Sequence, residues 1–158
     1  MTRKQVREFL KAGADALTMH FDAGRLTEFN KIADKGFPFT WVFELKAATE
    51  FGGSGATPID DWSINIRISK ADTPDSIQDQ YEEIIDDCDL FAQKLVGQYN
   101  LILSGSASVS TDNQDLYKLI TLSGINRDPF HKQHANPPTS GVDLSFNLNA
   151  PDKTDVCP

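Results

Sequence analysis

The stretch DWSINIRISK, residues 61–70, decides the fold, because apolar and polar side chains alternate along it. Such a period of two places successive residues on opposite faces of a β-strand. The apolar face carries Trp62, Ile64, Ile66 and Ile68. The polar face carries Ser63, Asn65, Arg67 and Ser69. The pattern therefore predicts a strand with its isoleucine face turned inward.

A second alternating stretch, FPFTWVFELKA (37–47), lies just before it. One face carries Phe37, Phe39, Trp41, Phe43 and Leu45, and the other carries Thr40, Val42, Glu44 and Lys46. FGGSGATP (51–58) is a turn-rich connection between the two stretches. We expect an antiparallel hairpin with a long tip, and we expect the aromatic face to pack under a helix.

LYKLITLSGI (116–125) and GVDLSFNLN (141–149) predict a second pair of strands. The segment between them, NRDPFHKQHANPPTS, reads as a Pro-rich irregular excursion, and residues 18–36 read as an irregular connection. Thr2 can cap a first helix that runs to about Ala16. ADTPDSIQ (71–78) begins a second helix that runs to about Asn100.

The expected order is α-β-β-α-β-β, which predicts one α+β domain over residues 1–149. Its two hairpins would join into one antiparallel sheet, with the long helix packed on one face. We expect flexible loops at about 51–59 and 104–114, and a C-terminal tail over 150–158.

Composition limits the classes of function. The net charge is −8, and residues 51–100 hold 3 Lys and Arg against 10 Asp and Glu, so this third supplies −7. Tight nucleic-acid binding, which needs a basic surface, is disfavoured. Neither a membrane span nor a signal peptide is expected, so we expect synthesis in a cytoplasm. Two cysteines give no disulfide framework; a Cys88–Cys157 bridge stays open, although a reducing compartment fits better.

YEEIIDDCDLFAQKL (81–95) is the densest group of carboxylates in the chain. At about 100° per residue, Cys88 falls in the apolar sector of the expected helix. The opposite sector holds Asp79, Glu82, Glu83, Asp86, Asp87 and Asp89. The thiol and the carboxylates point apart, which excludes a metal site that combines them on this helix. We interpret the acidic sector as a solvated face.

The remaining candidates also have structural interpretations. His131 and His134 could pair on a helix, but they lie in the Pro-rich stretch, so we expect surface histidines. Asp60 and Asp61 are expected to end a loop ahead of a strand, and Arg127 and Asp128 to form an ion pair that holds a turn. We expect no catalytic residue, no metal ligand and no cofactor.

Several stretches together resemble the tail-terminator, or tail-completion, proteins of tailed bacteriophages. They are MTRKQVREFLKAG, GRLTEFN, WSINIRISKAD, YEEIIDDCDLFAQKL, ITLSGINRDPFHKQHA and LSFNLNAPDKTDVC, and they span nearly the whole chain. The resemblance is one of pattern and element order. It implies a virion protein without catalytic residues or cofactor, typically six copies of which form a ring. Such a ring ends the tail tube, meets the head connector, and lets DNA pass without specific binding.

Within that resemblance, two sets of residues receive roles. For the face with Asp79, Glu82, Glu83 and Asp86, two interpretations stay open. It meets only solvent, or it lines the channel, where negative charge keeps DNA from sticking. The loops and tail are expected to act as assembly arms, through Gly52, Gly53, Gly55, Ser106, Ser108, Asp112, Asp152 and Val156. The alternatives are another neck or head-closure ring protein, a small-ligand binding module, and an enzyme that uses His131 and His134.

Overall fold

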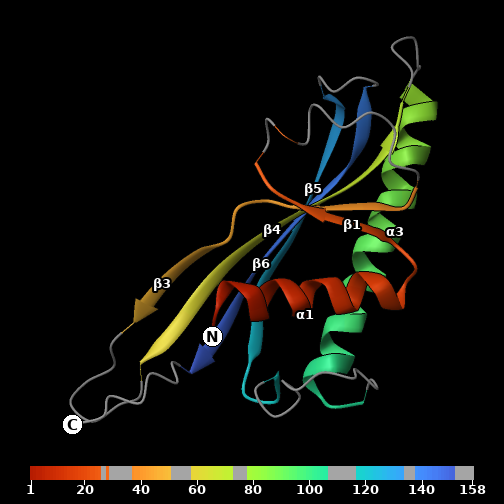
Figure 1. Cartoon of the computed structure of the whole chain (residues 1–158). Coiled ribbons are helices and arrows are strands. Elements are labelled where there is room, and N and C mark those ends of the chain that lie inside the picture. Colours follow the sequence, from red (N-terminus) through yellow and green to blue (C-terminus); the bar gives the residue numbers. More distant parts are fainter. Residues whose placement is uncertain are drawn as a thin grey trace, which may run out of the picture.

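A computed structural model of the chain describes residues 1–25, 28, 37–50, 58–72, 78–106, 117–133 and 138–151, with the side chains of 78, 79, 132, 133 and 151 left aside. Within these ranges the fold is α+β, with two helices and a six-stranded, mostly antiparallel sheet (Figure 1). The elements are α1 (Arg3–Ala16), β1 (His20–Ala23), β2 (Phe39–Val42), β3 (Lys46–Glu50), β4 (Ile59–Ala71), α3 (Gln78–Leu103), β5 (Thr121–Gln133) and β6 (Thr139–Pro151).

The sheet has the strand order β1-β2-β4-β6-β5, and β3 also pairs with β4. The central pair is β4 and β6, which run antiparallel from Ile59 opposite Pro151 to Ala71 opposite Thr139. The expected joining of two hairpins into one antiparallel sheet is thus confirmed. β6 continues through Pro151 and Ala150 is fully buried, so the strand runs two residues into the expected tail.

α1 begins where the sequence predicts, because Thr2 forms a capping box with Gln5. The Gln5 N–H donates to Thr2 Oγ1 at 3.2 Å, and the Thr2 N–H donates to Gln5 Oε1 at 2.8 Å. These bonds satisfy amide groups that a helix start otherwise leaves without partners. The buried side of α1 carries Val6, Phe9, Leu10, Gly13 and Ala14.

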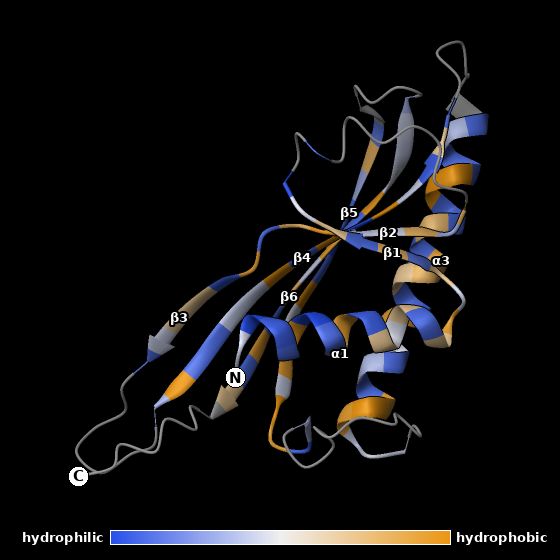
Figure 2. Ribbon diagram, in the orientation of Figure 1, coloured by the Kyte–Doolittle hydropathy of each residue, from blue (hydrophilic) through white to orange (hydrophobic). Residues whose placement is uncertain are grey.

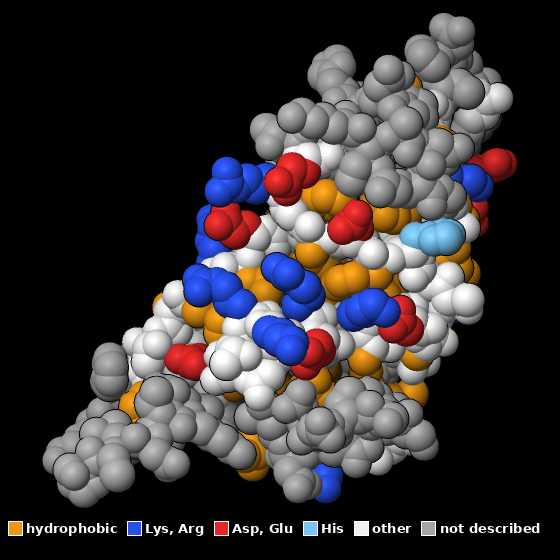
Figure 3. All heavy atoms as spheres, viewed as in Figure 1, with side chains coloured by type: hydrophobic (Ala, Val, Ile, Leu, Met, Phe, Trp, Pro, Cys, Tyr) orange, Lys and Arg blue, Asp and Glu red, His pale blue; other side chains and the backbone are white. Residues whose placement is uncertain are grey.

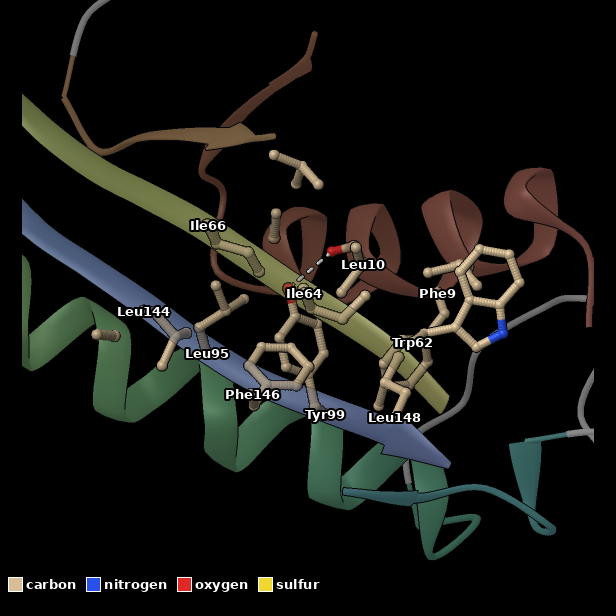
Figure 4. Close-up of a cluster of buried hydrophobic side chains, with 14 of the residues drawn as sticks. Phe9, Leu10, Trp62, Ile64, Ile66, Leu95, Tyr99, Leu144, Phe146 and Leu148 are labelled. Carbon is tan, nitrogen blue, oxygen red and sulfur yellow. Dashed lines mark hydrogen bonds between the residues drawn. The ribbon is translucent and has the colours of Figure 1, made fainter. Parts of the chain in front are cut away.

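Both helices pack against the isoleucine face of the sheet. Figure 2 shows hydrophobic and hydrophilic residues interspersed along these helices and strands. Side chains from α1, α3, β4 and β6 meet in one cluster (Figure 4). Tyr99 lies at its centre: the ring centroid is 5.0 Å from that of Phe9 and 5.6 Å from that of Phe146. Its buried hydroxyl donates to the Leu10 carbonyl oxygen at 3.2 Å. The contact joins the two helices through one fully buried side chain.

The expected strand over 37–47 is two strands, β2 and β3, separated at residues 43–45. The assignment of its aromatic face was wrong for Phe39 and Trp41, whereas Phe37 and Leu45 do pack with the core residues beneath the helices. Thr40 and Val42 face the helices, opposite Ile68 and Ile66, while Phe39 and Trp41 pack on the other side of the sheet. Both faces of β2 are buried, so alternation alone could not show which one meets the helices.

Two expected irregular segments contain strands. Within residues 18–36, β1 pairs in parallel with β2. The strand expected over 116–125 begins at Thr121 and continues as β5 through Pro129 to Gln133, so much of the Pro-rich excursion is extended. β5 is an outer strand, where a proline costs no inward hydrogen bond if its nitrogen faces away from the sheet.

Candidate functional site

The thiol and the carboxylates of α3 lie on opposite sides of the helix, as the helical pattern predicts. Cys88, Ala92, Leu95 and Tyr99 are fully buried, whereas Glu82, Glu83 and Asp86 are exposed. Burial, followed by the nearby charge of Asp87, raises the pKa of the Cys88 thiol to about 12, so the thiol stays protonated near neutral pH. Cys157 and the Asp79 side chain lie outside the described residues.

The next two carboxylates of α3 meet cations from the sheet. Asp87 lies 3.6 Å from Lys70 Nζ on β4, and Asp89 lies 2.6 Å from Arg127 Nη1 on β5. The expected turn pair of Arg127 with Asp128 is therefore wrong. The two residues cannot pair because they are consecutive in strand β5, where neighbouring side chains point to opposite faces of the sheet. Arg127 points toward α3.

His131 also lies on β5 rather than in a loop. Its ring stacks on Tyr81 of α3, with centroids 5.2 Å apart and planes 13° from parallel. His134, its expected neighbour, lies outside the described residues. In the part of the chain that the structure describes, no three His, Cys, Asp or Glu side chains gather as metal ligands would.

Asp60 and Asp61 belong to β4 and not to a loop end. The Thr49 hydroxyl on β3 donates to Asp60 Oδ1 at 2.9 Å, so this carboxylate links two strands. Of the residues assigned to assembly arms, Ser106 is described, and it lies just beyond the end of α3 at Leu103. Its N–H donates to the Leu101 carbonyl oxygen at 2.9 Å, next to Gly105 with φ of 74°. This is a Schellman cap.

The other expected arm residues lie outside the described ranges: Gly52, Gly53, Gly55, Ser108, Asp112, Asp152 and Val156.

The face of the sheet opposite the helices holds a charged cluster that sequence reasoning missed. Arg67 binds Asp143 with two hydrogen bonds of 2.7 Å, from Nε and Nη2, and its side chain is 7% exposed. The guanidinium carbon lies 4.1 Å from the ring centroid of Phe130 and 5.4 Å from that of Phe43. The alternation of Phe39, Trp41 and Phe43 was the available signal, but it was assigned to the opposite face.

A hollow of about 630 Å³ lies on the same face, and polar and apolar groups line it in about equal parts. Ser63 and Asn65 of β4 and Ser145 and Asn147 of β6 belong to that lining. Arg25 and Lys46 add two cations, Glu44 adds a carboxylate, and Asn126 adds a third amide. Hydroxyl, amide and cationic groups can bind a polar or anionic ligand.

The solvent side of α1 is basic, in contrast to the acidic side of α3. Lys and Arg side chains gather over this helix (Figure 3), and the exposed ones are Arg3, Lys4, Arg7 and Lys11. Two of them form exposed pairs one turn apart, Lys4 with Glu8 at 3.8 Å and Lys11 with Asp15 at 2.5 Å. Such pairs add only a few tenths of a kcal/mol each, about 0.3–0.5.

No protein-family model matches the chain, and the search of curated proteins returned no significant match. Among the described helices, none combines the length and the apolar character that crossing a bilayer requires.

Proposed function

We propose that this protein is a non-enzymatic structural protein of a tailed phage particle. In this proposal, copies of the chain, six by resemblance, form a ring that ends the tail tube and joins it to the head connector. The proposal rests on the pattern resemblance across the chain and on one structural observation, the exposed acidic face of α3.

The core fixes the orientation of that face. One side of α3 is held in the core by Cys88 and Leu95, so the helix cannot turn its other side away from solvent. Glu82, Glu83 and Asp86 project from that other side. Double-stranded DNA carries about one negative charge per 1.7 Å of its axis. A ring with these faces turned inward would repel DNA from its wall and let it pass.

The side chains that would first suggest catalysis have structural contacts, which supports a role in assembly. Asp60 bonds Thr49, Asp89 pairs with Arg127, and His131 stacks on Tyr81. Each contact connects two elements of the fold. The protein would therefore work by presenting surfaces, and its partners would be further copies, the tail-tube protein and the connector.

The first test is assembly. We expect the purified chain to form rings on isolated tail tubes, visible by electron microscopy, and phage lacking the gene to make tubes of irregular length. A chain that binds the head connector but leaves tube length unchanged would favour the alternative neck or head-closure ring. A chain that binds neither tubes nor connectors would contradict the whole proposal.

The second test concerns the acidic face. In the Glu82→Lys, Glu83→Lys, Asp86→Lys variant, rings should still form, but DNA ejection should slow because the channel wall now attracts phosphate. The matched control reverses three exposed acids elsewhere, Glu44, Asp15 and Asp128. Unchanged ejection in the first variant, or equal slowing in both, would remove the channel role from α3.

One observation favours a second candidate function, a small-ligand binding module. The hollow on the outer sheet face, about 630 Å³, has the size of a small-molecule site. A stable monomer that retains a polar metabolite through purification, detected by native mass spectrometry, would support this candidate over the ring.

A further inference from the structure

β3 is a strand with one open edge. It pairs with β4 from Lys46 opposite Ser63 to Glu50 opposite Ile59, and all five of its side chains are exposed. Its other edge meets no strand within the described ranges, and Figure 1 shows it at the margin of the sheet. Such an edge presents N–H and C=O groups that can pair with another strand.

The opposite margin of the sheet, β5, is much less suited to accept a strand. Pro129 interrupts its row of N–H donors, and its pairing with β6 shifts register twice, between Ser123 and Asn126 and between Phe130 and Gln133. Prolines and bulges are the devices that protect natural sheet edges. β3 contains no proline, and its register with β4 is unbroken.

The sequence of β3, Lys-Ala-Ala-Thr-Glu, is complementary to itself when two copies run antiparallel. With Ala48 on the two-fold axis, Lys46 lies opposite the partner's Glu50, and Ala47 lies opposite the partner's Thr49. The two-fold repeats the Lys–Glu pair on both sides of the axis. Opposite charges at such cross-strand positions attract, and like charges repel.

The side chains of each Lys–Glu pair would also lie on the same face of the sheet. Lys46, Ala48 and Glu50 lie opposite Ser63, Asp61 and Ile59 of β4, alternate residues that share one face of the sheet. Both charges of each pair therefore stand on the same side of the joined sheets. Alanine at the axis leaves room for the backbones to approach.

We propose that a second copy of this chain binds the β3 edge through its own β3, antiparallel about Ala48, so that one sheet continues across both copies. The contact is isologous and leaves α1 and α3 free. It does not depend on the proposed ring, because two copies can pair about a two-fold axis whether or not a ring forms.

Charge exchange on the full-length chain tests this pairing, with the dissociation constant of the dimer measured by analytical ultracentrifugation. Lys46→Glu places Glu opposite Glu at both pairs, and we expect it to weaken the dimer by about tenfold or more. Glu50→Lys should weaken it similarly. The double variant should return to within about threefold of the wild-type constant. An equimolar mixture of the two single variants should form a heterodimer, since each Glu then faces a Lys.

Glu44→Lys is the matched control, an exposed charge reversal just outside β3 that should leave the constant unchanged. A wild-type chain that remains monomeric at every concentration would overturn the proposal. So would a dimer that the single reversals do not weaken, or one that the double variant does not restore. A ring that forms normally with Lys46→Glu, and without any two-fold dimer, would refute this contact and leave the proposed function standing.

Discussion

Replacing Gly13 by Ala tests how closely α1 and α3 pack. A Cβ atom at this position would lie 2.7 Å from Cδ1 of Tyr99 and still nearer to Cε1. Carbon atoms in contact normally stand about 3.5–4.0 Å apart. The added methyl group therefore needs either the tyrosine ring or one whole helix to move.

The ring has little freedom to move. Tyr99 is fully buried, its ring lies against Phe9 and Phe146, and its hydroxyl is bonded to Leu10. Overpacking of such a site costs about 1–3 kcal/mol. Because the added Cβ would lie far inside contact distance of the ring, the cost should fall in the upper part of that range, about 2–3 kcal/mol. Alanine has a higher helix propensity than glycine, which offsets up to about 1 kcal/mol of this cost. After this gain in helix propensity, we expect Gly13→Ala to lower the free energy of unfolding by about 1–2 kcal/mol.

Gly97 provides the matched control, since it is an exposed glycine within α3 and a Cβ there meets no atom within 4 Å. With no clash, Gly97→Ala should raise the free energy of unfolding by about 0.8–1 kcal/mol. Urea unfolding, followed by circular dichroism, measures both. If Gly13→Ala proved as stable as the wild type while Gly97→Ala showed the expected gain, the described spacing of α1 and α3 would be refuted.

Three further predictions concern buried polar groups. Tyr99→Phe removes the hydrogen bond to Leu10 without changing the ring, so the free energy of unfolding should fall by about 1 kcal/mol in urea titrations. Asp143→Ala removes the carboxylate that binds the buried Arg67 guanidinium, which lies near the rings of Phe130 and Phe43. We expect the free energy of unfolding to fall by about 3 kcal/mol, and a loss below about 1 kcal/mol would mean that water reaches the guanidinium. The pKa of Cys88 is raised from 9.0 to about 12, so between these pH values the unfolded chain releases a proton that the folded chain keeps. Stability should therefore decline over that window, and the decline should be shallower in Cys88→Ala; equal slopes would contradict the burial of the thiol.

The helices could be read from the sequence because their signals are local. Thr2 and Gln5 form a capping box within four residues, and the apolar sector around Cys88 repeats at helical spacing. The alternation in 61–70 and 141–149 likewise identified β4 and β6 and their inward faces. In each of these segments the inward side or face is apolar and mostly buried, so the periodicity identifies it.

Segments without that asymmetry could not be read. β2 buries both faces, and its core-facing pair, Thr40 and Val42, is less apolar than the aromatic pair behind it. The position of Phe39 and Trp41 depends on their cross-strand neighbours, Ser69 and Arg67, which are distant in sequence. β5 is exposed along most of its length and contains Pro129, so only its pairing with β6 shows that it is a strand.

The charges of β3 have two opposed interpretations, and symmetry decides between them. A lysine on an outer strand commonly prevents association, because an incoming apolar strand would have to bury it. In β3 the lysine stands four residues from a glutamate, with Ala48 midway. Pairing with an unrelated strand would leave Lys46 and Glu50 without opposite charges and would be disfavoured. In an antiparallel pair of β3 strands, each of these charges lies opposite the other one from the second copy. The same two residues would therefore exclude other strands and select a second β3. The Lys46→Glu and Glu50→Lys mixture tests that selection directly, since only complementary pairing predicts that two weakened variants associate with each other.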